Sequence, residues 1–126
     1  MIQRFLEACP SFEKNWEEHR AQNGTDILYY IVLGDFAHHL LELHQNNQTE
    51  TFPAIARAIE DLLLEGDSFV KEAASIGLLE AIQNVWANNE VDPELFYSYL
   101  LPISAKWWQS VNDFWNGKIK SVGEGL

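Results

Sequence analysis

The chain has 126 residues, enough for one domain with one hydrophobic core. Its apolar share of 47% and its five tryptophans exclude a disordered chain. No run approaches the roughly 18 apolar residues that a membrane span needs. The net charge of −11 argues against binding to nucleic acid or to an anionic lipid surface, because both are themselves negatively charged.

The acidic residues are unevenly distributed. Residues 21–104 contain thirteen acidic residues but only two basic ones, Arg57 and Lys71, so this part alone carries a charge of −11. Acidity often serves only to keep a protein hydrated, but its concentration in one part of the chain favours a basic binding partner.

Helical signals recur along the first half of the chain. Residues 2–8 are expected to form a helix that ends before Pro10. Ser11 is a candidate cap for a second helix over 12–22. Asp26 is expected to open a long third helix to residue 44, although residues 28–32 taken alone could also form a strand.

The second half continues this pattern. Residues 52–65 have the cleanest apolar stripe, and Gly66 and Asp67 form a short link to a helix over 68–88, which predicts an antiparallel hairpin. The helix over 68–88 is apolar nearly all round and is therefore expected at the centre of the protein. A short helix follows Asp92 and ends near Pro102, and the last helix is expected from Ser104 to Gly117.

These elements predict an all-α fold, with residues 1–126 forming a single domain of six or seven helices. Helix pairs joined by tight turns indicate antiparallel hairpins, arranged as a HEAT-like stack or as an irregular bundle. Residues 118–126 are expected to form a frayed tail.

Asp35, His38, His39 and Glu42 form the first candidate site, because their i, i+3, i+4, i+7 spacing places them on one helix face. Metal sites and acid–base pairs use such spacing, but a metal site in a bundle also needs ligands from a second helix. All four histidines lie within the first 44 residues. We therefore expect no metal and no catalytic role, and interpret this face as solvated or partner-binding.

A second candidate site lies around Gly66. Glu60, Asp61, Glu65 and Asp67 form the densest acidic cluster, and they are expected on a solvated face or at a partner interface. Arg57 is expected to pair with Asp61 one turn on. Glu80 is the only charged residue between Glu72 and Glu90 and is expected to be structural, bonded to a neighbouring helix or emerging at its edge.

Other motifs for chemistry are absent. The sequence has no glycine-rich phosphate loop, no nucleophile elbow and no paired-cysteine zinc site, so neither an enzyme nor a cofactor is expected. The tryptophans of the last helix are expected mainly in the core, and Cys9 as a buried thiol. A single cysteine and an N-terminus without a secretory signal predict a cytoplasmic protein.

Four segments resemble an uncharacterised bacterial family of small helical proteins. They are AIEDLLLEGD (58–67), GLLEAIQN (77–84), LPISAKWW (101–108) and DFWNG (113–117). The members of that family look like immunity proteins of contact-dependent-inhibition and other polymorphic toxin systems, and the likeness spans about residues 28–117. Its motifs are packing motifs and carry no catalytic residue over.

The resemblance implies an immunity protein that binds a cognate toxin domain, of basic nuclease type, and blocks its active site or substrate path. An acidic surface would speed association with such a domain. Two alternatives stay open. One is a helical-repeat adaptor or an acidic nucleic-acid mimic that binds another basic protein, and the other is an enzyme that uses Asp35, His39 and Glu42.

Overall fold

Every regular element of the computed structural model, which describes residues 1–126, is a helix, and there is no β-strand. The predicted all-α fold is therefore confirmed. Residues 68–88 form one continuous helix whose middle part has π-helical geometry. When this stretch is counted as a single helix, the protein has seven helices. The elements are α1 (Ile2–Ala8), the 3₁₀ turn η1 (Pro10–Phe12), α2 (Glu13–Asn23), α3 (Tyr29–Gln45), α4 (Phe52–Glu65), α5 (Ser68–Glu72), the π-helix η2 (Ala73–Leu79), α6 (Glu80–Asn88), α7 (Glu94–Tyr97) and α8 (Pro102–Trp115).

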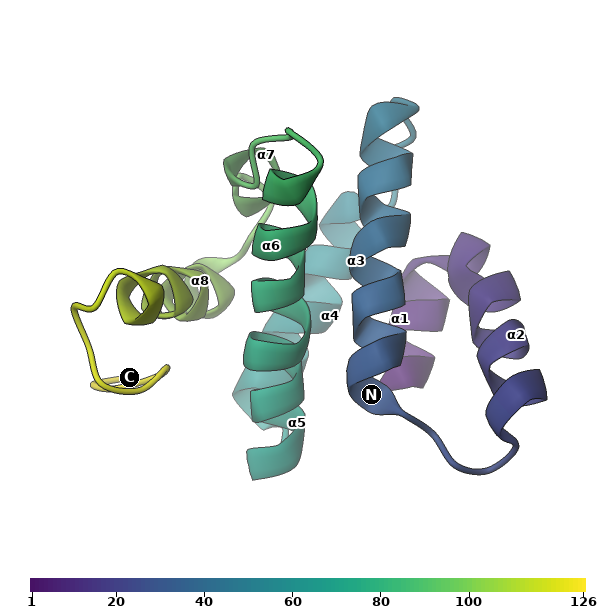
Figure 1. Ribbon diagram of the computed structural model, residues 1–126, viewed down its shortest axis with the longest axis horizontal. Helices are drawn as coiled ribbons and strands as arrows, with labels where there is room; N and C mark the ends of the chain where they lie inside the picture. The colour runs from purple at the N-terminus through teal and green to yellow at the C-terminus, as the bar shows by residue number, and fades with distance from the viewer.

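The helices α3, α4 and α5–η2–α6 form the centre of an irregular bundle. Figure 1 shows α3 and α5–η2–α6 side by side and running in the same direction, with α4 behind them running back. The hairpin predicted at Gly66 is thus present. Helices α1 and α2 cover one side of this centre, while α7 and α8 cover the other (Figure 1).

The core lies where these helices meet and is rich in aromatic side chains. Trp86 is fully buried and donates a hydrogen bond from its indole nitrogen to the Ala37 carbonyl, 3.3 Å away. Its ring lies 5.7 Å from that of Phe96, which in turn lies 6.4 Å from that of Trp108. A buried indole N–H needs such an acceptor, so this bond fixes α6 against α3.

Gly77 allows the closest approach between η2 and α3. A Cβ atom at this position would lie 2.9 Å from Cδ1 of Leu33 and 3.3 Å from Cε1 of Tyr30. The missing side chain therefore lets Leu33 enter the core and lets the Tyr30 ring lie against the η2 backbone.

Three helix starts differ from the predictions. The third helix begins at Tyr29 rather than at Asp26, because the Leu28 N–H donates to Nε2 of His19 and holds residues 26–28 against α2. The last helix begins at Pro102 rather than at Ser104, where proline suits the first turn. Ser11 does not cap the second helix, since its hydroxyl binds His39 instead.

The segment after α8 folds back on the helix instead of fraying. The Gly123 N–H donates to Oγ of Ser110 at 2.6 Å, and Gly123 lies against the Trp107 ring. The Lys120 N–H donates to the Glu124 carboxylate at 2.8 Å and closes the turn. Local composition pointed to a loose end, whereas these contacts connect the segment to α8.

None of the helices combines the length and the apolar character that crossing a membrane requires.

Candidate protein-binding surface

The acidic cluster around Gly66 is mostly engaged within the protein, beginning with Glu60. Its carboxylate is buried and accepts hydrogen bonds from the Ile103 N–H at 3.1 Å and from the N–H and hydroxyl of Ser104, both at 2.7 Å. The expectation that Glu60 lies on a solvated, partner-facing surface is therefore wrong. Glu60 instead satisfies N–H groups in the first turn of α8, which have no partner within that helix.

The hydrogen bonds to Glu60 also set its ionisation. Burial acts to raise the pKa of its carboxyl group, but the Ser104 hydroxyl, the N–H groups of Ser104 and Ile103 and the charge of Arg57 together lower that pKa below its ordinary value. The helix start of α8 is thus built around a charged carboxylate.

The other members of this cluster have internal partners as well. Arg4 on α1 contacts Asp61 at 3.2 Å and Glu65 at 3.4 Å, and Arg57 contacts Asp61 at 3.4 Å as predicted. Asp67 caps α5, because its carboxylate accepts the Val70 N–H at 2.9 Å. These contacts engage the carboxylates of Asp61, Glu65 and Asp67 within the chain, although Glu65 and Asp67 remain exposed.

The acidic face of α3 is placed differently. Asp35, His38 and Glu42 are exposed and make no ion pair within the chain. His39 is half-buried, with Nε2 2.8 Å from the Ser11 hydroxyl and its ring against Phe12. Burial lowers the pKa of His39, with an opposing effect from Glu42, so the neutral ring is favoured. Of the four predicted residues, His39 is thus a packing residue.

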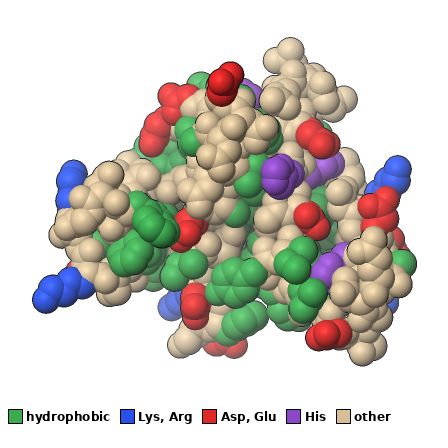
Figure 2. Space-filling view, in the orientation of Figure 1, with side chains coloured by type: hydrophobic (Ala, Val, Ile, Leu, Met, Phe, Trp, Pro, Cys, Tyr) green, Lys and Arg blue, Asp and Glu red, His purple; other side chains and the backbone are tan.

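An exposed apolar surface lies at the start of α3. We define the "α3 surface" as six exposed side chains from α3, its approach segment, α5 and η2. They are Leu28, Tyr29, Tyr30, Ile31, Phe69 and Ile76. Figure 2 shows hydrophobic side chains gathered over the adjoining ends of α3 and α5, with acidic side chains beside them.

The sequence reasoning missed this surface. The sequence places the helix over 68–88 at the centre of the protein and predicts no apolar surface at the start of the third helix. The structure leaves Tyr29 and Ile76 exposed instead, because no further helix covers this end of α3 and α5 (Figure 1). An apolar residue looks the same in the sequence whether its side chain packs in the core of the protein or stays exposed on the surface.

A groove of about 400 Å³ between α2 and α3 borders the α3 surface. Leu28 and Ile31 line it together with the carboxylates of Glu18 and Asp35. His19, which is buried at its base and holds the Leu28 N–H, fixes the wall formed by residues 26–28. The groove therefore joins the acidic face of α3 to the apolar one.

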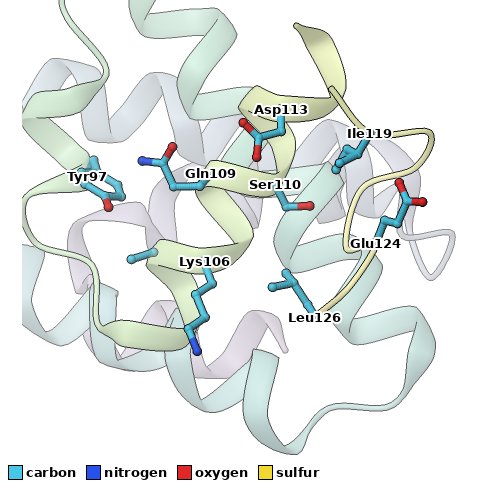
Figure 3. A pocket seen from close by; sticks show the side chains of 9 residues that line it. Tyr97, Lys106, Gln109, Ser110, Asp113, Ile119, Glu124 and Leu126 are labelled. Atoms are coloured by element: carbon cyan, nitrogen blue, oxygen red, sulfur yellow. The ribbon is translucent and has the colours of Figure 1, made fainter. Parts of the chain in front are cut away.

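A further pocket of about 330 Å³ lies between α8 and the folded-back tail (Figure 3). Asp113, Glu124 and the Ser110 hydroxyl lie at one end, and the Lys106 side chain points away from them. The Ser110 hydroxyl is already engaged by the Gly123 N–H. The Glu124 carboxylate likewise accepts the Lys120 N–H, so both groups take part in holding the tail.

The remaining groups considered are Cys9 and the side chains that could hold a metal ion. Cys9 is buried, with Sγ 3.4 Å from the Ser11 hydroxyl. No group of three or more His, Cys, Asp or Glu side chains is placed to hold a metal ion.

The structure is an all-helical single domain whose exposed features include an acidic face on α3 and an adjoining apolar surface. By sequence the chain belongs to a family described as a domain of unknown function, DUF7674, whose model matches residues 2–116. No characterised protein and no solved structure matches the chain.

Proposed function

We propose that this protein is an immunity protein, which binds a cognate toxin domain of basic nuclease type and blocks its active site or substrate path. The observation that supports this proposal is the negative charge on the exposed surface. The three ion pairs within the chain involve only Asp61 and Glu65 among the acidic residues, so most of the remaining carboxylates have no cation of their own.

An acidic surface of this kind is suited to a basic enzyme. Complementary charge steers the encounter and raises the association rate, and the desolvated centre of the interface then supplies most of the affinity. A nuclease carries cationic side chains for its polyanionic substrate, so an acidic protein bound there competes with nucleic acid for the same groups. No chemistry by the immunity protein itself is required.

Growth rescue tests this proposal. The proposal expects a neighbouring gene that encodes a large protein with a basic C-terminal toxin domain. That domain is expressed alone and together with the protein, and we expect growth to stop in the first case and to continue in the second. A variant with Asp35→Lys and Glu42→Lys is expected to rescue less well. Toxicity that persists at full expression of the folded wild-type protein would contradict the proposal and would favour an adaptor or a mimic with another basic partner.

A further inference from the structure

Four consecutive residues at the start of α3 expose apolar side chains. Ile31 is 54% exposed and Tyr30 is 46% exposed, and Phe69 on α5 is 47% exposed. Isolated apolar residues on a surface are ordinary, but Leu28 to Ile31 are consecutive, and Tyr29 packs against Phe69 of the neighbouring helix. A continuous patch of this kind marks an interaction site.

The patch is held in place before any partner arrives. The Tyr29 ring packs edge-to-face against Phe69, with 5.5 Å between the ring centroids. The Tyr30 ring lies over the η2 backbone at Gly77, where a Cβ would be 3.3 Å away. Burial, followed by the negative charge of Glu72 and a hydrogen bond to it, raises the pKa of Tyr30, which keeps the hydroxyl protonated. Ordered aromatic side chains lose little conformational entropy on binding.

The carboxylates around the patch define what can cover it. Asp26 precedes Leu28 by two residues, Asp35 lies one turn beyond Ile31, and Glu72 lies beside Tyr30. A second copy of this chain would bring the same carboxylates, and a total charge of −11, against them. A basic protein surface with projecting apolar side chains is complementary to the α3 surface both in charge and in apolar character.

We propose that the α3 surface is the anchor of the interface, where apolar side chains of a basic partner pack on Tyr29, Tyr30 and Ile31 inside a rim of carboxylates. This inference rests on the proposed function and names the part of the molecule that performs it. In this interface the uncharged side chains supply the binding affinity, and the carboxylates orient the partner.

Another exposed aromatic residue offers a comparison. Trp115 on α8 is 62% exposed and packs edge-to-face with Phe114. It stands close in sequence to Lys118 and Lys120, in the part of the chain that has no acidic excess. Charge complementarity to a basic partner is therefore weaker there, and Trp115 serves as a control.

The test compares two pairs of variants for binding to the purified toxin domain encoded beside this gene. Ile31→Asp and Leu64→Asp are matched, because both side chains are aliphatic, helical and 54% exposed, and both changes add one negative charge. Tyr30→Ala and Trp115→Ala form the aromatic pair. We expect Ile31→Asp and Tyr30→Ala each to raise Kd about tenfold or more, and the two controls to change Kd by less than about twofold.

Three results would overturn the inference, and they are distinguishable. Wild-type binding that Ile31→Asp and Tyr30→Ala leave unchanged would place the anchor elsewhere while the proposed function stands. A wild-type protein that does not bind the toxin domain would overturn the proposed function and this inference with it. A wild-type dimer in sedimentation that Ile31→Asp dissociates would assign the surface to a second copy. Circular dichroism and thermal unfolding confirm that each variant is folded.

Discussion

At the scale of single residues, Glu60 shows how a charged side chain can serve the interior. In the sequence Glu60 lies among other acidic residues. Its carboxylate nevertheless points into the protein and accepts hydrogen bonds from the first turn of α8. A buried carboxylate is tolerated only when its oxygens are hydrogen-bonded, and both oxygens of Glu60 are. Its role is to join α4 to α8, two helices some forty residues apart in the sequence.

Replacing Glu60 by glutamine is expected to destabilise the protein by about 1–3 kcal/mol. The neutral amide weakens the charge-assisted bonds and turns an N–H₂ group toward an N–H donor. Urea unfolding at neutral pH measures the free energy of unfolding. Glu65→Gln is the control, because its side chain is 67% exposed, and it is expected to change that free energy by less than about 0.5 kcal/mol.

The stabilisation from Glu60 should depend on pH in a defined direction. Because the pKa is lowered in the folded protein, the contribution is fully present above the ordinary glutamate pKa of about 4.3 and is lost as the pH falls through the lower folded-state value. The stability difference between wild type and Glu60→Gln should therefore narrow on acidification below about pH 4.3. A difference that stays constant down to pH 3 would contradict the lowered pKa.

At the scale of the elements, local signals located the helices well, and long-range contacts account for the differences. The stripe over 52–63 and the Gly66–Asp67 link depend on neighbouring residues, and the structure has that helix and that hairpin. The start of α3 depends on a bond between Leu28 and His19, and the burial of Glu60 depends on Ser104. Such contacts leave no periodic trace in the sequence.

The candidate site could be predicted only in part for the same reason. The exposure of Asp35, His38 and Glu42 followed from their position on α3 relative to Phe36 and Leu40, which are fully buried. The apolar α3 surface could not be foreseen, since that required knowing that no helix covers it. Whether either surface binds a partner stays a prediction.

Two helical glycines test the packing of η2 against α3. Gly77→Ala places a methyl group 2.9 Å from Cδ1 of the fully buried Leu33, and is expected to lower the free energy of unfolding by about 1–2 kcal/mol. Gly34→Ala in α3 meets no atom within 4 Å and is expected to raise it by about 0.5–1 kcal/mol, because alanine favours the helix. Chemical denaturation of both variants measures the difference, and equal effects would show that Gly77 is not a close-contact position.

At the scale of the whole molecule, the paired and the unpaired carboxylates lie on different parts of the protein. Two cations, Arg4 and Arg57, form the ion pairs within the chain, and both contact carboxylates on α4. The side of α3 that carries Asp35 and Glu42 keeps its charge, and the apolar α3 surface adjoins it across the groove beside α2. The fold thus presents apolar area at the start of α3 and charge further along the same helix.

We propose that exposed acidic residues guide a basic toxin domain onto the protein. The association rate with the neighbouring toxin domain, measured from about 50 to 500 mM salt, tests this directly. The wild type is compared with Asp35→Lys/Glu42→Lys and with Glu7→Lys/Glu13→Lys, which changes the net charge equally but outside residues 21–104. We predict that the wild-type rate falls about tenfold or more as salt rises, and that at low salt the first variant is slowed more than the second. A rate that is independent of salt and equal in all three proteins would contradict the claim.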